Sequence, residues 1–118
     1  DVGLAHVLLK VQDLSDHSGQ PFRVHGIDGA LVFNGEIYNA DDLRKELLSR
    51  HAVQFRTVGD TEVLFWGLVY EGAQFIEKTN GDFAFAFYRR KEKQLLLARD
   101  RLGVKPLYYC RSANQTFR

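Results

Sequence analysis

The sequence predicts a layered α+β domain with mostly antiparallel strands, and three observations support this class. Two segments have the apolar spacing of helices, about six short segments are rich in residue types that favour strands, and the strands are apolar on both faces. The 118 residues are 45% hydrophobic and 13% aromatic, which is ample for a globular core. We therefore expect residues 1–118 to form one domain.

The first part of the chain predicts two strands and a long loop. Residues 4–11 are dominated by apolar and β-branched types and suit a strand. Residues 13–29 carry the Asp, Ser, Gly and Pro signals of a loop, and residues 30–33 then resume as a strand. Residues 54–57, further along, suit a short edge strand. The first hairpin is thus expected to have a long loop.

Two helices are predicted in the middle of the chain. Asn39 can cap a helix over residues 40–50, whose apolar stripe consists of Leu43, Leu47 and Leu48. A second helix begins at Asp60 or Thr61 and stops at Gly72. Because the second helix is apolar on nearly all sides, we expect it to be largely buried.

Two further strands are predicted after the second helix. Residues 82–88 alternate phenylalanine with alanine, so that both faces of the strand are expected to be covered and the phenylalanine face is a candidate interface between two sheets. Residues 94–98 contain three successive leucines and are expected to be covered in the same way. The basic residues 89–93 between them are interpreted as a solvated hairpin turn rather than a nucleic-acid patch.

Charge and cysteine content exclude several classes of function. A net charge of +1, with basic and acidic residues dispersed, gives no footprint for nucleic acid or for an anionic membrane. No stretch approaches the roughly 18 to 20 apolar residues of a membrane span, and no signal-peptide pattern opens the chain. With one cysteine, Cys110, and four histidines without ligand spacing, we predict neither a disulfide, nor a metal, nor a cofactor. The cytoplasm is the expected compartment.

Three blocks in a fixed order carry the functional signal. Residues 31–39 read Leu-Val-Phe-Asn-Gly-Glu-Ile-Tyr-Asn, residues 59–63 read Gly-Asp-Thr-Glu-Val, and residues 98–109 read Ala-Arg-Asp-Arg-Leu-Gly-Val-Lys-Pro-Leu-Tyr-Tyr. Together they resemble the glutamine-hydrolysing domain of asparagine synthetases, a class II amidotransferase with an N-terminal nucleophile. The resemblance implies a four-layer helix, sheet, sheet, helix sandwich, of which this chain would be a piece truncated at both ends.

The same resemblance implies a function and its site. Such a domain releases ammonia from glutamine and passes it to a synthetase domain that activates aspartate with ATP. The side-chain amide of Asn34 and the backbone N–H of Gly35 would donate to the oxyanion, while Glu36 and Asp60 would hold the ammonium group of the substrate. From the residues alone, Asn34-Gly35 is also a common hairpin turn pair, and Asp60 is also a helix cap.

The last block has a structural interpretation. Asp100, with an arginine on either side, is expected to order a turn, and Lys105-Pro106 is expected to lead into another strand. Cys110 follows this apolar and aromatic run, so we expect it to be a small buried hydrophobe and not a nucleophile.

Two positions depart from the family pattern. The nucleophile of the family is a cysteine at the first residue of the mature chain, where this sequence has Asp1, and Leu8 stands where an arginine would clamp the glutamine carboxylate. We therefore expect weak glutamine binding and no glutaminase activity. The alternatives are a catalytically silent binding or assembly module with the same fold, and another class II amidotransferase, for a sugar or a purine precursor. The expected partners are glutamine, a synthetase domain or a second copy of the chain, which would give a homo-oligomer.

Overall fold

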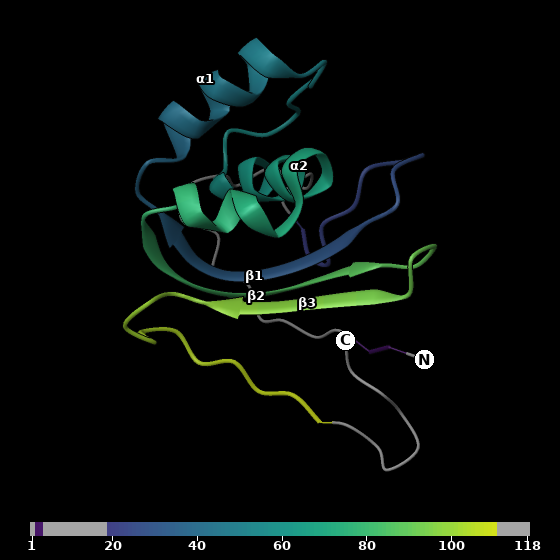
Figure 1. Cartoon of the computed structure of the whole chain (residues 1–118), viewed down its shortest axis with the longest axis vertical. Coiled ribbons are helices and arrows are strands. Elements are labelled where there is room, and N and C mark those ends of the chain that lie inside the picture. Colours follow the sequence, from purple (N-terminus) through teal and green to yellow (C-terminus); the bar gives the residue numbers. More distant parts are fainter. Residues whose placement is uncertain (1, 4–18, 111–118) are drawn as a thin grey trace.

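The computed structural model describes residues 2–3 and 19–110, which form one antiparallel sheet with helices on one of its faces (Figure 1). The strands are β1 (Ala30–Ile37), β2 (Gly81–Arg89) and β3 (Gln94–Arg99), in the order β1-β2-β3. Between β1 and β2 the chain forms helices α1 (Ala40–Arg50) and α2 (Asp60–Glu71) and a 3₁₀ helix, η2 (Gly72–Lys78). The predicted α+β class is confirmed. Of the four expected layers, the described residues provide one sheet and the helical layer above it.

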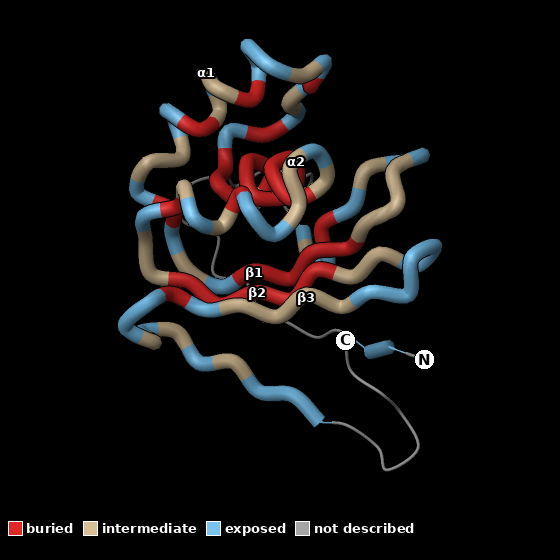
Figure 2. Tube along the Cα trace, in the orientation of Figure 1, coloured by how far each residue is buried: buried red, intermediate tan, exposed pale blue. Residues whose placement is uncertain are grey.

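The core lies between the sheet and α2. Phe83, Phe85 and Phe87 of β2 are buried together with Leu31 and Phe33 of β1, and the ring centroids of Phe87 and Phe65 in α2 are 5.9 Å apart. The phenylalanine face of β2 therefore packs against the helical layer, and its assignment to an interface between two sheets was wrong. The alanine face is buried as well, so the strand is covered on both faces as predicted. Figure 2 shows the buried residues concentrated in α2 and in the central parts of β1 and β2.

The β2–β3 hairpin confirms one prediction and corrects another. Residues 94–98 do pair with β2 across the exposed basic turn, with Phe87 opposite Leu96 and Phe85 opposite Ala98. The leucines of β3 are only partly buried, however, because β3 is the edge strand of the described sheet. The strand is therefore not covered like β2.

Helix α1 has the predicted bounds, but two details differ. The side chain of Asn39 forms no capping hydrogen bond, and its amide instead donates to the Lys78 carbonyl (2.8 Å) and accepts from the N–H of Asn80 (2.9 Å). Leu43 and Leu47 join the core as expected, whereas Leu48 is 52% exposed. Asn39 thus ties the start of α1 to the start of β2.

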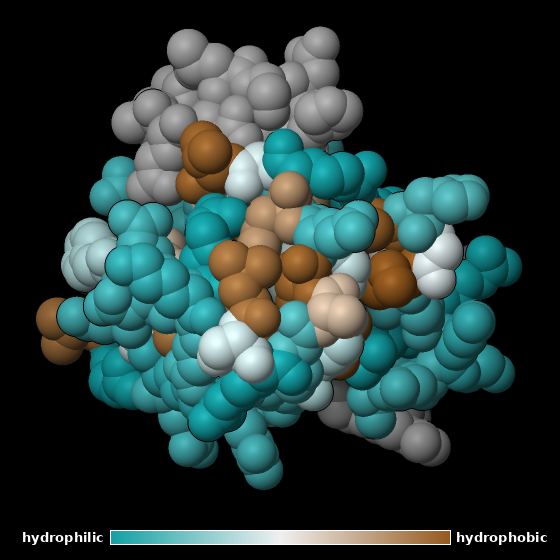
Figure 3. Space-filling model, turned by 90° about the horizontal axis from the view of Figure 1, so that it is seen from above, coloured by the Kyte–Doolittle hydropathy of each residue, from teal (hydrophilic) through white to brown (hydrophobic). Residues whose placement is uncertain are grey.

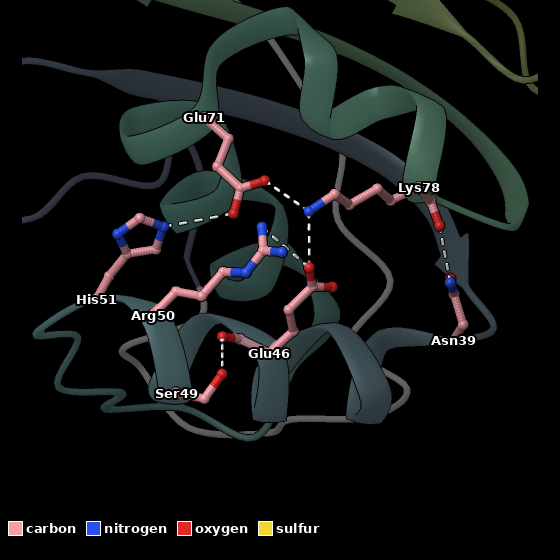
Figure 4. A network of polar contacts seen from close by, with 7 residues as sticks. All are labelled: Asn39, Glu46, Ser49, Arg50, His51, Glu71 and Lys78. Atoms are coloured by element: carbon pink, nitrogen blue, oxygen red, sulfur yellow. Dashed lines mark hydrogen bonds and ion pairs between the residues drawn. The ribbon is translucent and has the colours of Figure 1, made fainter.

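A polar network fastens α1 to the other two helices (Figure 4). Lys78 Nζ lies 2.7 Å from Glu46 Oε1 and 2.8 Å from Glu71 Oε1, and His51 Nε2 lies 3.4 Å from Glu71 Oε2. The pKa of the Glu71 carboxyl is lowered mainly by its hydrogen bond to Lys78. One lysine of η2 therefore joins a carboxylate of α1 to a carboxylate of α2.

Helix α2 is the most buried element. It begins at Asp60, and Gly72 ends it with a φ of 68° and an N–H that donates to the Leu68 carbonyl, as the sequence predicted. Seen from the helical side, the surface is mainly hydrophilic with a small group of apolar side chains near the middle (Figure 3). The exposed large apolar side chains of the helices and the loop between them are Leu48, Val58 and Tyr70.

Two predicted strands need comment. Residues 54–57 form no strand, because the N–H groups of Arg56 and Thr57 donate to the buried carboxylate of Glu62 rather than to a neighbouring strand. The strand predicted at residues 4–11 lies outside the described residues, as do Asp1 and Leu8. No helix in the described ranges is long and apolar enough to cross a bilayer.

Candidate active site

The outer edge of β1, facing away from β2, is the framework of the candidate site. In an antiparallel ladder the backbone groups of successive residues point to opposite edges. Leu31 uses its outward groups to pair with Phe22, through N–H to O distances of 2.7 and 3.0 Å. Phe33, two residues on, directs its outward N–H and carbonyl to the side-chain amide of Gln20, at 2.5 and 2.8 Å.

Gly35 is the next residue whose N–H the ladder directs outward. Its φ is 134°, a backbone conformation that residues with a side chain rarely adopt. A Cβ atom at this position would lie 2.0 Å from the carbonyl oxygen of Asp82. Asn34 and Gly35 lie within β1, opposite Ala84 and Phe83, so the hairpin-turn alternative is excluded. The glycine instead allows β1 and β2 to approach closely at this point, next to an N–H that points away from β2.

Ile37 is the next residue of β1 whose N–H points outward, and Asp60 binds this N–H. Its Oδ2 accepts the N–H of Ile37 at 2.7 Å, and the residue is 6% exposed at the start of α2. Burial raises the pKa of the Asp60 carboxyl, and the charge of Glu36 adds to the rise, while the N–H groups of Ile37, Asp60 and Thr61 act in the opposite direction. Asp60 is not the N-cap residue of α2, because the helix begins at Asp60 itself and Gly59 is the N-cap.

Acidic groups surround this end of β1. Glu36 is exposed and lies opposite Asp82 in the β1–β2 register, so two carboxylates face each other across the strands. The Tyr38 hydroxyl donates to Asp82, and this hydrogen bond is the main reason why the pKa of Tyr38 is raised. Like charges at opposing positions repel, which favours a cationic ligand group at this place.

The four predicted site residues are thus brought to one end of β1. Asn34, Gly35 and Glu36 are consecutive in the strand, and Asp60 is bonded to Ile37, the next residue. The arrangement offers an amide side chain and an outward N–H as donors to an oxyanion, with carboxylates beside them for an ammonium group. No group of three His, Cys, Asp or Glu residues in the described part of the chain could hold a metal ion.

Sequence reasoning missed the residues that hold Asp60 in place. The carboxylate of Glu62, fully buried in the first turn of α2, accepts the N–H and hydroxyl of Thr57 at 2.7 and 2.8 Å. Arg44 of α1 donates to the carbonyls of Thr57 (3.1 Å) and Gly59 (3.0 Å) from the other side. The available signal was Glu62 directly before the apolar run of residues 63–69, because a carboxylate that is buried with such a run requires several donors.

The 98–109 block orders a turn, as its structural interpretation proposed. The buried carboxylate of Asp100 accepts the N–H groups of Phe83, Leu102, Val104 and Lys105, and these bonds lower its pKa. The strand expected after Lys105-Pro106 is absent, since residues 104–110 have no regular secondary structure. Cys110 is exposed, so its expected burial was wrong.

The sheet and the helical layer form an α+β fold, and the comparisons with known proteins assign it to the amidotransferases of the N-terminal-nucleophile type. The chain belongs to the glutamine amidotransferase domain family, which it matches over residues 1–118. It is 44% identical over 84 residues to "Asparagine synthetase [glutamine-hydrolyzing] 3" of Bacillus subtilis, which covers 71% of this chain and 14% of the relative. It is 39% identical over 112 residues to "Amidase chry2" of Gibberella zeae, covering 92% of this chain and 16% of the relative.

A solved structure has the same fold. The glutamine phosphoribosylpyrophosphate amidotransferase of B. subtilis, solved with ADP and GMP, superposes with a TM-score of 0.60 and 28% identity over 74% of this chain and 21% of that one. The present chain therefore spans less than a quarter of each of these three proteins. It corresponds to the glutamine amidotransferase domain of asparagine synthetase-like proteins.

Proposed function

We propose that this chain provides the oxyanion and ammonium subsites of a glutaminase that supplies ammonia for the amidation of aspartate. The observation that carries the proposal is the row of outward groups on β1, in which Gly35 lies between the Gln20-bound Phe33 and the Asp60-bound Ile37. Its N–H and the Asn34 amide belong to the same strand as Ile37, whose N–H is bonded to the buried Asp60 carboxylate. Glutamine has the matching groups, namely a side-chain carbonyl and an α-ammonium.

The chemistry that these residues support is acyl transfer. Attack on the glutamine side-chain carbonyl places negative charge on its oxygen, and the Asn34 amide with the Gly35 N–H would stabilise that charge. Glu36 and Asp60 would hold the α-ammonium, so the substrate is oriented by charges fixed in the fold. The released ammonia would pass to a synthetase domain, which is the proposed partner.

The nucleophile is not among the residues of this site. The 118 residues contain one cysteine, Cys110, which is exposed after the 98–109 block. We propose that this polypeptide alone has no glutaminase activity and binds glutamine weakly, because Leu8 replaces the arginine expected for the carboxylate. A silent binding module is the second candidate, and Leu8 is the observation that favours it.

Glutamine titration followed by amide NMR tests the proposal. We expect saturable shifts at residues 34–37 and their loss in Asp60→Asn, in which the side-chain oxygen can still accept the Ile37 N–H while the charge is removed. Glu77→Gln, which removes a charge from an exposed position on η2, is the matched control and should bind as the unmodified chain does. Absence of any shift would refute glutamine binding and leave the silent module. Ammonia release above background that Asn34→Ala abolishes would contradict the proposed inactivity.

A further inference from the structure

A second concave site lies at the end of the sheet away from Asn34. A cavity of about 480 Å³, open to solvent on one side, is lined by residues 23–25 and 27–30 and by Tyr88 and Arg90. Ala30 pairs with Tyr88 at this end of the β1–β2 ladder, whereas Ile37 pairs with Gly81 at the other, so the cavity is separate from the candidate glutamine site. In Figure 1 the loop before β1 and the β2–β3 turn lie at the same end of the strands.

The cavity has an excess of positive charge. Arg23 and Arg90 line it from two different elements, and neither forms an ion pair within residues 19–110. His25 adds a third nitrogen-bearing side chain to the lining. Among the residues that the structure describes, Asp28 is the only acidic one that lines it, and its two carboxylate oxygens accept the N–H groups of Arg90 (3.0 Å) and Lys91 (3.2 Å). Two arginines and one aspartate therefore line the cavity, and the aspartate carboxylate already accepts two backbone N–H groups.

The bonds of Asp28 also explain why the cavity is formed in advance. They fasten the β2–β3 turn to the loop before β1, although these segments are more than sixty residues apart in sequence. The backbone of Arg90 is thus held next to the loop that carries Arg23, which reduces the backbone entropy lost when a ligand bridges the two residues. The basic turn at residues 89–93 therefore contributes a lining residue, Arg90, to this cavity.

The remaining wall is apolar and aromatic. Val24 and Ile27 are partly buried against the core, and Tyr88 is half-buried beside Arg90. A volume of this size lies within the range of small-molecule sites, about 300 to 1,000 Å³. It exceeds what an inorganic anion alone would fill.

We propose that this cavity binds a small phosphate monoester that carries a planar apolar group. A phosphate has three acceptor oxygens and a charge of about −1.5 to −2 at neutral pH. Guanidinium forks on two sides can bond such a group in bidentate fashion. The planar group would pack on Tyr88 and the aliphatic wall.

Phenyl phosphate is the probe for an NMR test on the unmodified chain. We expect saturable amide shifts confined to residues 23–29 and 88–91, and weaker binding of inorganic phosphate. Arg23→Ala and Arg90→Ala should each lower the affinity for phenyl phosphate at least tenfold. Both arginines are exposed and the Arg90 N–H is retained, so the fold should persist, as circular dichroism would verify. Tyr88→Ala should reduce the preference for phenyl phosphate over inorganic phosphate.

Arg56→Ala is the matched control, because Arg56 is an exposed arginine that does not line the cavity. It should leave the affinity unchanged. An equal loss in Arg56→Ala and Arg90→Ala would show general attraction to a cationic surface and overturn the proposal. Absence of saturable shifts would overturn it as well. Equal affinity for phenyl phosphate and inorganic phosphate would refute the planar-group part of the assignment.

Discussion

Replacing Glu62 tests the support beneath the candidate site. The side chain is fully buried and accepts hydrogen bonds from the N–H of Arg56 (3.1 Å to either oxygen), from the N–H and hydroxyl of Thr57 (2.7 and 2.8 Å), and from Trp66 Nε1 (3.2 Å). Glu62→Ala leaves these donors without their acceptor. An unsatisfied buried donor costs about 1 to 3 kcal/mol.

The expected loss follows from that inventory. The Thr57 hydroxyl can rotate to another acceptor, so the N–H groups dominate, and Glu62→Ala should lower the free energy of unfolding by about 4 kcal/mol. Glu62→Gln keeps one oxygen as an acceptor and should lower it by about 2 kcal/mol. Glu77→Ala, an exposed glutamate of η2, is the control and should change it by less than about 0.5 kcal/mol.

Urea denaturation followed by circular dichroism and by Trp66 fluorescence measures these values. A Glu62→Ala variant within about 1 kcal/mol of the unmodified chain would refute the reasoning, because it would show that water replaces the carboxylate at little cost. A loss equal to that of Glu77→Ala would refute it in the same way.

Two further predictions concern the core and the site. Phe85→Ala should lower the free energy of unfolding by about 3 to 5 kcal/mol in chemical denaturation, because Phe85 is 1% exposed beneath the helical layer; a change below about 1 kcal/mol would place it outside the core. Burial raises the folded-state pKa of Asp60 above its ordinary value of 3.8, so the stability that this group contributes is present below that value and is lost as pH rises through the folded pKa. The Asp60→Asn variant should therefore have a melting temperature at or above that of the unmodified chain at pH 7, and the difference should shrink toward pH 3. A variant that is less stable than the unmodified chain at pH 7 would contradict this sign.

The elements that the sequence predicted well have local signals. The bounds of α2 depend on Asp60 in its first turn and on Gly72, which adopts a positive φ readily because it has no side chain. Both signals determine the backbone within a few residues, so they can be read from the local sequence. Alternation in β2 likewise shows that both faces are covered. Alternation cannot show what covers each face, which is why the phenylalanine face was assigned to a second sheet instead of α2.

The elements that were predicted wrongly depend on distant partners. Residues 54–57 have strand-forming composition, but the Glu62 carboxylate takes the N–H groups that a strand would share. Asn39 has the residue type of a cap, but the Lys78 carbonyl and the Asn80 N–H, about forty positions away, engage its amide. The candidate site was proposed from whole blocks of sequence, since Asn34-Gly35 alone favoured a turn.

The edge of β1 explains how this fold keeps a backbone donor available. A neighbouring strand along the whole edge would pair with Leu31, Phe33, Gly35 and Ile37 alike. Instead, true strand-like pairing ends at Leu31, and side chains replace it beyond: the Gln20 amide bonds Phe33, and the Asp60 carboxylate bonds Ile37. These side chains satisfy the residues on either side of Gly35, and within residues 19–110 no strand pairs with Gly35 at this edge. Glu62 and Arg44 fix the segment that carries Asp60, so the bond between Asp60 and the Ile37 N–H depends on the packing of the helices as much as on β1.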